Sequence, residues 1–173
     1  MKEIRKLNAN EIEVKVKKVT ERGCLLLLYK TARTDMQLLD ETFGPLNWQC
    51  DYKTINGVLY CGIAIKNEGE WVWKWDCGIE SRADEDGNEK KGEASDAFKR
   101  AGTKIGIGRE LYTSPFIWAK VPTEYDQEHK KWVLKNPFQK FYVNQIAYNT
   151  KGEISVLAIL DDKGNRIFSG HRE

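Results

Sequence analysis

The chain has 173 residues, 40% of them hydrophobic and 11% aromatic, which suits one folded core and excludes a wholly disordered chain. Its 28 lysines and arginines nearly balance 26 aspartates and glutamates, so a polyanion site requires local clustering of cations. No apolar run approaches the ~20 residues of a membrane-spanning helix, and the stretch MKEIRKLNANEIEVKVKK lacks the apolar centre of a secretory signal. We therefore expect a cytoplasmic protein with no membrane partner.

The first third of the chain predicts a β-hairpin and a helix. Residues 12–19 alternate between apolar and charged side chains, residues 24–29 are an apolar run, and Glu21-Arg22-Gly23 is a turn signal between them. From residue 31 to residue 43 the period becomes helical, and Gly44-Pro45 ends the helix. Its apolar stripe consists of Ala32, Met36, Leu39 and Phe43.

The next segment predicts a three-stranded meander over residues 47–55, 58–66 and 70–79. Asn56-Gly57 is a strong hairpin signal, and Asn67-Glu68-Gly69 supplies the second turn. On the third strand a row of tryptophans shares one face, and such a row more often packs under a helix than stacks on bases. Lys74 then lies on the solvent side. The row is Trp71, Trp73 and Trp75.

After a charged loop at residues 81–91, residues 93–105 predict an amphipathic helix that leads into the turn glycines Gly106 and Gly108. Its apolar face consists of Ala94, Ala97, Phe98, Ala101 and Ile105, and its opposite face of Asp96, Lys99, Arg100, Thr103 and Lys104. The glycines follow a helix, whereas those of a phosphate loop precede one, so we assign them to ending the helix.

The rest of the chain predicts a polar linker over residues 121–137 and a C-terminal appendage over residues 138–173. The appendage alternates again and has two turn signals, which favours a β-hairpin or a three-stranded meander. Residues 1–120 form the predicted core. The expected fold class is α+β, an antiparallel β-meander with a β-β-β-α core, an N-terminal hairpin and helix packed on it, and the appendage.

The histidines, carboxylates and cysteines of the chain give little support for an enzyme. The two histidines, His129 and His171, lie in the linker and near the end of the chain, where neither is placed as a catalytic base. A metal-dependent nuclease needs clustered carboxylates, for which Glu13 and the pair Asp76 and Glu80 are the candidates. Four widely spaced cysteines form no zinc pattern, and we expect buried free thiols. We expect no enzyme activity, no metal and no cofactor.

Nucleic-acid binding fits the clustered cations better. A strand is held without sequence preference by cations that meet phosphates and by flat side chains that stack. The second predicted helix and its end carry Lys99, Arg100, Lys104 and Arg109, and the start of the first carries Tyr29, Lys30 and Arg33. With Lys74 these residues form the predicted site. A Lys-Arg pair on a helix is also common on ordinary solvated faces, and Asp96 can pair with Arg100.

Three features in this order resemble the Rad52/Rad22 family of single-strand annealing proteins, especially its small phage members of the Sak type. They are the helix ending in LLDETFGPLNW, the meander after it, and the segment KGEASDAFKRAGTKIGIGRELY. The resemblance covers residues 14–118. It implies a multimeric ring that holds single-stranded DNA in a cationic groove with its bases exposed for pairing, without covalent chemistry.

By position, the resemblance assigns Lys99 and Arg100 to the basic pair of the groove and Tyr29 to an aromatic near the DNA. Thr103 and Thr34 stand where many eukaryotic members carry arginine, and Lys104 and Arg33 each lie one residue away. Gly106, Gly108, Arg109 and Tyr112 match the phage-type motif. We expect Arg109 to contact phosphate or a neighbouring subunit.

The leading hypothesis is therefore a phage or prophage protein that binds single-stranded DNA and anneals complementary strands in recombination and repair. Its expected partners are single-stranded DNA, further copies of itself in a ring, and a host or phage single-strand-binding protein. Two alternatives stay open. One is a module that protects DNA ends without annealing, and the other is a metal-dependent nuclease.

Overall fold

The computed structural model describes residues 3–78 and 89–171. The chain divides into two compact units, the first formed by Met1–Lys6 and Lys30–Arg109 and the second by Leu7–Tyr29 and Glu110–Glu173. Within the described residues, no helix is both long and apolar enough to cross a membrane. The end of the predicted third strand and residues 81–88 of the predicted charged loop lie outside the described residues, and residues 89–91, which were expected to belong to that loop, are helical.

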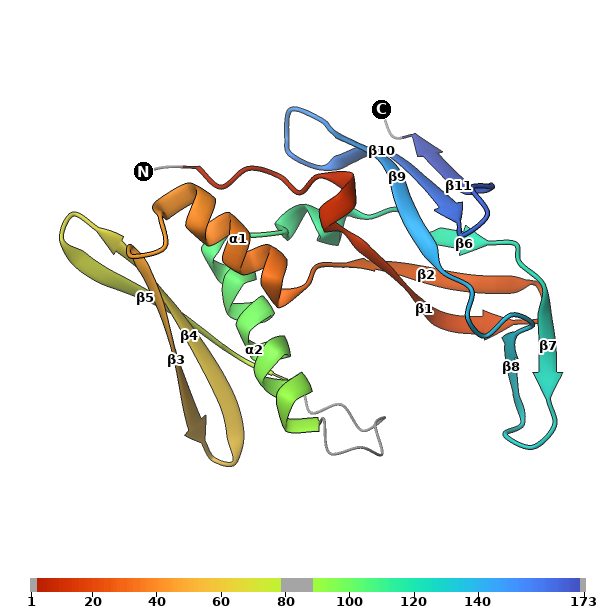
Figure 1. Ribbon diagram of the computed structural model, residues 1–173, viewed down its shortest axis with the longest axis horizontal. Helices are drawn as coiled ribbons and strands as arrows, with labels where there is room; N and C mark the ends of the chain where they lie inside the picture. The colour runs from red at the N-terminus through yellow and green to blue at the C-terminus, as the bar shows by residue number, and fades with distance from the viewer. Residues whose placement is uncertain (1–2, 79–88, 172–173) are drawn as a thin grey trace. The chain divides into compact units, whose positions relative to one another are not determined.

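The first unit consists of a three-stranded antiparallel sheet with two helices (Figure 1). In chain order its elements are α1 (Ala32–Phe43), β3 (Trp48–Ile55), β4 (Val58–Asn67), β5 (Glu70–Cys77) and α2 (Glu89–Ile105). The strands lie in the order β3-β4-β5, as the predicted meander requires. Asn56 and Gly57 both adopt positive φ, at 51° and 79°, which is the backbone that a two-residue hairpin turn needs.

Helix α1 begins and ends where its sequence indicates. Thr31 is the N-cap, and its side chain accepts a hydrogen bond from the backbone N–H of Thr34 at 3.2 Å. Gly44 ends the helix with φ of 88° and donates its N–H to the carbonyl of Asp40 at 2.9 Å. Leu38 and Leu39 are fully buried.

Helix α2 packs its predicted apolar face on the sheet. Ala97, Phe98 and Ala101 are at most 1% exposed, and Phe98 meets the edge of Trp48 with ring centroids 6.1 Å apart. The small alanines let the helix lie close to β4 and β5. This packing confirms the amphipathic pattern read from the sequence.

The tryptophan row lies on the opposite face of the sheet, which corrects the expectation that it packs under a helix. Alternation along β5 places Asp76 on the same face as Lys74, and Asp76 pairs with Arg100 and Lys104 of α2. Helix α2 therefore covers the Lys74 face. Trp75 lies instead over Gly62, its partner on β4, where an added Cβ would be 2.5 Å from the indole ring.

The second unit is built on a six-stranded antiparallel sheet in the order β11-β10-β9-β1-β2-β6. Its strands are β1 (Glu13–Thr20), β2 (Gly23–Tyr29), β6 (Ile117–Ala119), β9 (Phe141–Tyr148), β10 (Ile154–Asp161) and β11 (Arg166–His171). Two 3-10 turns, η1 (Ala9–Glu11) and η2 (Arg109–Thr113), lie outside the sheet. The side chain of Glu110 is buried and accepts the N–H of Leu7 at 2.8 Å.

These strands confirm the α+β class and show two features that the sequence did not predict. Residues 121–137, expected to be a linker without structure, contain the hairpin of β7 (Thr123–Asp126) and β8 (Lys131–Leu134). The N-terminal hairpin pairs through β1 with β9, so residues 138–171 continue a sheet that begins at residue 13. All four cysteines are free, with Cys24 and Cys61 buried and Cys50 exposed.

The two helices of the first unit meet at a buried ion pair. Lys30 and Asp35 are 6% and 0% exposed, with Nζ and Oδ2 2.5 Å apart. The same ammonium donates to the backbone carbonyl of Lys99 on α2 at 2.9 Å. At this point α2 has Gly102, where an added Cβ would overlap Asp35 Oδ2 and lie 3.1 Å from its Cγ. Glycine is therefore required at position 102, because the backbone of α2 lies too close to the Asp35 carboxylate for a side chain.

We predict that Gly102→Ala lowers the free energy of unfolding by about 1–3 kcal/mol, because the added methyl group overpacks the ion pair. Gly92 on the same helix has no atom within 4 Å of an added Cβ. Gly92→Ala is the matched control, and it should stabilise the protein by up to ~1 kcal/mol through helix propensity. Urea unfolding of both variants measures the contrast. Equal effects of the two substitutions would contradict the close-approach explanation.

Candidate nucleic-acid interface

Three cations of α2 are partly exposed beside its buried face, and two of them, Arg100 and Lys104, reach Asp76 on β5. The side chains of Lys99, Arg100 and Lys104 are 28%, 43% and 50% exposed. Because Ala97, Phe98 and Ala101 hold the helix in the core, these three side chains, which we call the α2 row, stand on a rigid support. The sequence predicted this arrangement.

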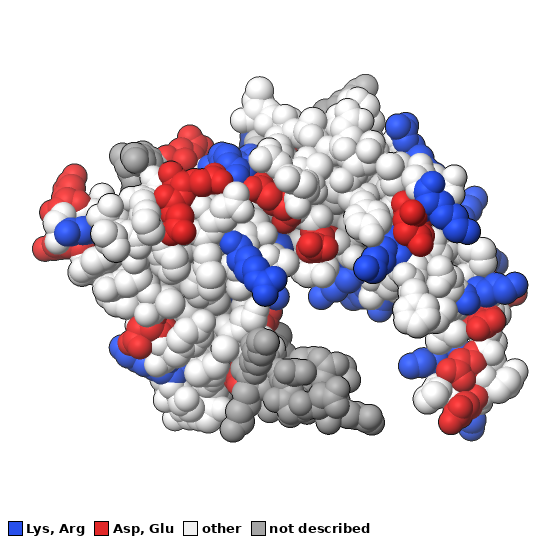
Figure 2. Space-filling view, viewed as in Figure 1, with Lys and Arg blue, Asp and Glu red and all other residues white. Residues whose placement is uncertain are grey.

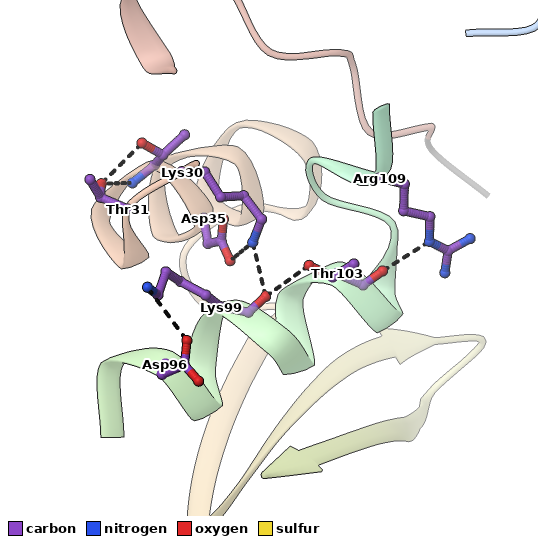
Figure 3. Close-up of polar contacts among 8 residues, drawn as sticks. Lys30, Thr31, Asp35, Asp96, Lys99, Thr103 and Arg109 are labelled. Atoms are coloured by element: carbon purple, nitrogen blue, oxygen red, sulfur yellow. Dashed lines mark hydrogen bonds and ion pairs between the residues drawn. The ribbon is translucent and has the colours of Figure 1, made fainter. Parts of the chain in front are cut away.

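Each cation of the α2 row is already close to a carboxylate. Lys99 Nζ lies 3.7 Å from Asp96 Oδ1, and Arg100 and Lys104 both lie 3.6 Å from Asp76 (Figure 3 shows the first pair). Two cations therefore share one aspartate. Ion pairs with this much exposure are worth ~1 kcal/mol or less, so a phosphate can displace the carboxylates at small cost.

Arg109 is anchored to the C-terminal end of α2. Its Nε donates to the carbonyl of Thr103 at 2.9 Å (Figure 3), and its Nη2 donates to the carbonyl of Lys104 at 2.8 Å. The Thr103 carbonyl also accepts the N–H of Gly106 at 3.1 Å, so Arg109 adds a further donor to the carbonyls at this end of the helix. Gly106 and Gly108, with φ of 128° and 69°, turn the chain there. Arg109 thus has a structural role and a fixed guanidinium.

Lys30 needs a correction, because the sequence placed it among the exposed cations. Its ammonium is buried between α1 and α2 and is bound by Asp35 and by the carbonyl of Lys99 (Figure 3). A lysine that follows an apolar strand carries no local sign of such burial, since its partner Asp35 lies on the helix that follows. Lys30 therefore supports the helix that carries the α2 row and does not face solvent.

The other residues of the predicted site belong to different elements of the structure. Lys74 is exposed on the face of β5 that α2 covers, and it lines a groove together with Lys104 and Arg109. Arg33 is exposed in the first turn of α1. Tyr29 belongs to the second unit, where it is half-buried and Lys15 Nζ lies 5.4 Å from its ring centroid. Burial raises the pKa of the Tyr29 hydroxyl.

The groove beside the end of α2 was not anticipated from the sequence. It has a volume of about 650 Å³ and brings Lys6 near Lys74, Lys104 and Arg109. Lys6 comes from the N-terminal segment, about a hundred residues from Arg109, so no local pattern could place the two together. Figure 2 shows lysines and arginines interspersed with acidic residues on the face that it presents.

The face of the first unit's sheet that carries the tryptophan row is an aromatic surface, and it also carries lysines. Trp73 and Trp75 stack with ring centroids 5.3 Å apart and planes 21° apart. Lys53 Nζ lies 4.5 Å from the centroid of Trp75, and Lys66 Nζ lies 6.0 Å from that of Trp71. Trp71 is 37% exposed. The rings are thus partly covered by lysines of the same sheet.

The carboxylates proposed for a nuclease do not assemble in the described part of the chain. No group of three or more His, Cys, Asp or Glu side chains within residues 3–78 and 89–171 is placed to hold a metal ion. Asp76 is engaged by Arg100 and Lys104, and Glu80 lies outside the described residues. His129 pairs with Asp126 on an exposed turn.

Comparisons of the chain with protein-family models, curated proteins and solved structures find no match.

We predict that Asp35 makes the stability of the protein depend on pH. Burial raises the pKa of Asp35 from 3.8 to about 6, although Lys30 opposes the shift. Between these values the unfolded chain releases the proton first, so the free energy of unfolding falls by roughly 3 kcal/mol as pH rises from about 4 to 6.

Urea unfolding of wild type and Asp35→Asn across this pH range measures the effect. The asparagine does not titrate, so the difference in unfolding free energy between the two proteins should change by that amount. Asp162→Asn, at an exposed aspartate, is the control and should run parallel to wild type. Parallel curves for Asp35→Asn as well would contradict the prediction.

Proposed function

We propose that this protein binds single-stranded DNA without sequence preference and anneals complementary strands in recombination. The observation that carries the proposal is the α2 row, in which Lys99, Arg100 and Lys104 stand exposed on a helix that is held by the core. The resemblance of this segment to Rad52/Rad22 annealing proteins supports the same function. The protein acts as a homo-oligomeric ring in the bacterial cytoplasm and is encoded by a phage or prophage.

The α2 row suits the phosphate backbone in particular. A strand brings a regular line of negative charges, and each phosphate that meets a lysine or arginine releases condensed counterions. The aspartates that neutralise the row in the free protein are held weakly and can be exchanged for phosphates. Arg109 and Lys74 add positive charge beside Lys104.

The composition of α2 favours annealing over simple sequestration of bases. Its single aromatic residue, Phe98, is 1% exposed, so the α2 row offers cations and no stacking surface. A protein that holds the backbone by charge leaves the base edges free to meet a complementary strand, whereas stacking would occupy the bases. A module that only protects DNA ends does not need to keep the base edges free.

The first test removes the centre of the α2 row. The double variant Lys99→Ala with Arg100→Ala should lose affinity for oligothymidylate by at least about tenfold and lose accelerated annealing, because two phosphate contacts are gone. Fluorescence anisotropy and a two-oligonucleotide annealing assay measure these effects. The matched control is Lys17→Ala with Lys18→Ala, an adjacent exposed pair on β1. Normal annealing by the first variant would refute the assignment, and binding without annealing by wild type would favour the end-protecting module.

The second test uses salt. If the α2 row contacts three phosphates, the logarithm of the binding constant should fall against the logarithm of salt concentration with a slope of about −2 per protomer. The double variant should have a slope smaller in magnitude by about 1.4, because two contacts are missing. Titrations at several potassium chloride concentrations give both slopes. A flat response by wild type would exclude a site that grips phosphates.

A further inference from the structure

We infer that the groove beside the end of α2 is a docking site for an acidic peptide segment that carries apolar side chains. This inference goes beyond the proposed function, since its ligand is a protein segment and its test contains no DNA until the last step. The groove lies wholly within the first unit and has a volume of about 650 Å³, which is within the usual range of ligand sites.

The floor of the groove is apolar. It is lined by Ile4, Phe43, Ile65, Val72 and Ile105, which come from the N-terminal segment, α1, β4, β5 and α2. Val72 is 45% exposed, and it therefore gains from being covered. Aliphatic side chains of this kind accept a leucine, isoleucine or phenylalanine side chain of a bound peptide.

The rim of the groove is cationic. Lys6, Lys74, Lys104 and Arg109 line it, and Glu3 is the one acid among the lining residues. Lys74 makes no ion pair with any described residue. Arg109 is held by the carbonyls of Thr103 and Lys104 through Nε and Nη2, so its Nη1 edge is oriented for a carboxylate. Charge complementarity thus selects an acidic ligand.

The chemistry of the floor favours a peptide over a nucleic acid. Bases bind to flat aromatic rings or to groups that read their edges, whereas four of the five floor residues are branched aliphatics. Trp71 lies on the other face of the sheet, and Tyr52, an exposed aromatic on the α2 face, does not line the groove. Acidic residues next to apolar anchors match both parts of the groove.

The experiment uses the full chain and a fluorescein-labelled peptide with a run of aspartates followed by Leu-Phe and a free carboxylate. Val72→Asp should weaken binding by at least about tenfold, because it places a charge in the apolar floor. Val58→Asp is the matched control, at a valine that is 39% exposed on β4 and outside the groove, and it should bind as wild type does. Lys74→Glu should weaken binding by about five- to tenfold at low salt, and by less at high salt.

Three results would overturn the inference. The first is no binding of the peptide by wild type. The second is equal binding of a peptide in which serines replace Leu-Phe, which would show attraction by charge alone. The third is that Val72→Asp weakens the binding of oligothymidylate as strongly as the binding of the peptide, which would make the groove part of the DNA site. Loss of annealing in the Lys99 and Arg100 double variant is independent of all three, so the two proposals fail separately.

Discussion

The buried ion pair between Lys30 and Asp35 is the constraint on which the candidate interface depends. It joins α1 to α2, and the same ammonium holds the carbonyl of Lys99, which is a member of the α2 row. Charges buried this deeply are tolerated only when they are paired and hydrogen-bonded. Gly102 leaves the space that the pair occupies. A buried lysine outside the α2 row thus helps to hold in place the helix that carries the row.

Helix α2 packs on the sheet through its apolar residues and also carries the cations of the candidate interface. Alanines and Phe98 pack on the sheet, and the α2 row lies partly exposed beside them, with Arg100 and Lys104 reaching Asp76 on β5. Asp76 on β5 offsets one of the two positive charges of Arg100 and Lys104 in the free protein, which limits repulsion between these neighbouring cations. Since these ion pairs are partly exposed, breaking them costs little free energy. The electrostatics of the free protein therefore leave the row ready for a polyanion.

Local patterns predicted most of this first unit, because periods, caps and turns act over a few residues. The end of α1 at Gly44, the Asn56-Gly57 turn and the apolar face of α2 are as expected. What failed depends on distant partners. The burial of Lys30 requires a glycine some seventy residues away, and the pairing of β1 with β9 joins the two ends of the chain. The β7–β8 hairpin was missed because each of its strands has only four residues, too few for a clear alternating pattern.

Lys104 lies where the α2 row and the groove meet. It pairs with Asp76 as part of the row, and it also lines the groove with Lys74 and Arg109. One ammonium cannot fully serve a phosphate on the row and a carboxylate in the groove at the same time. Under the two proposals, occupation of either surface would lower the affinity of the other, and by thermodynamic reciprocity the two effects would be equal. A partner with an acidic, apolar-anchored segment would in this way loosen the protein's hold on a strand without touching Lys99 or Arg100.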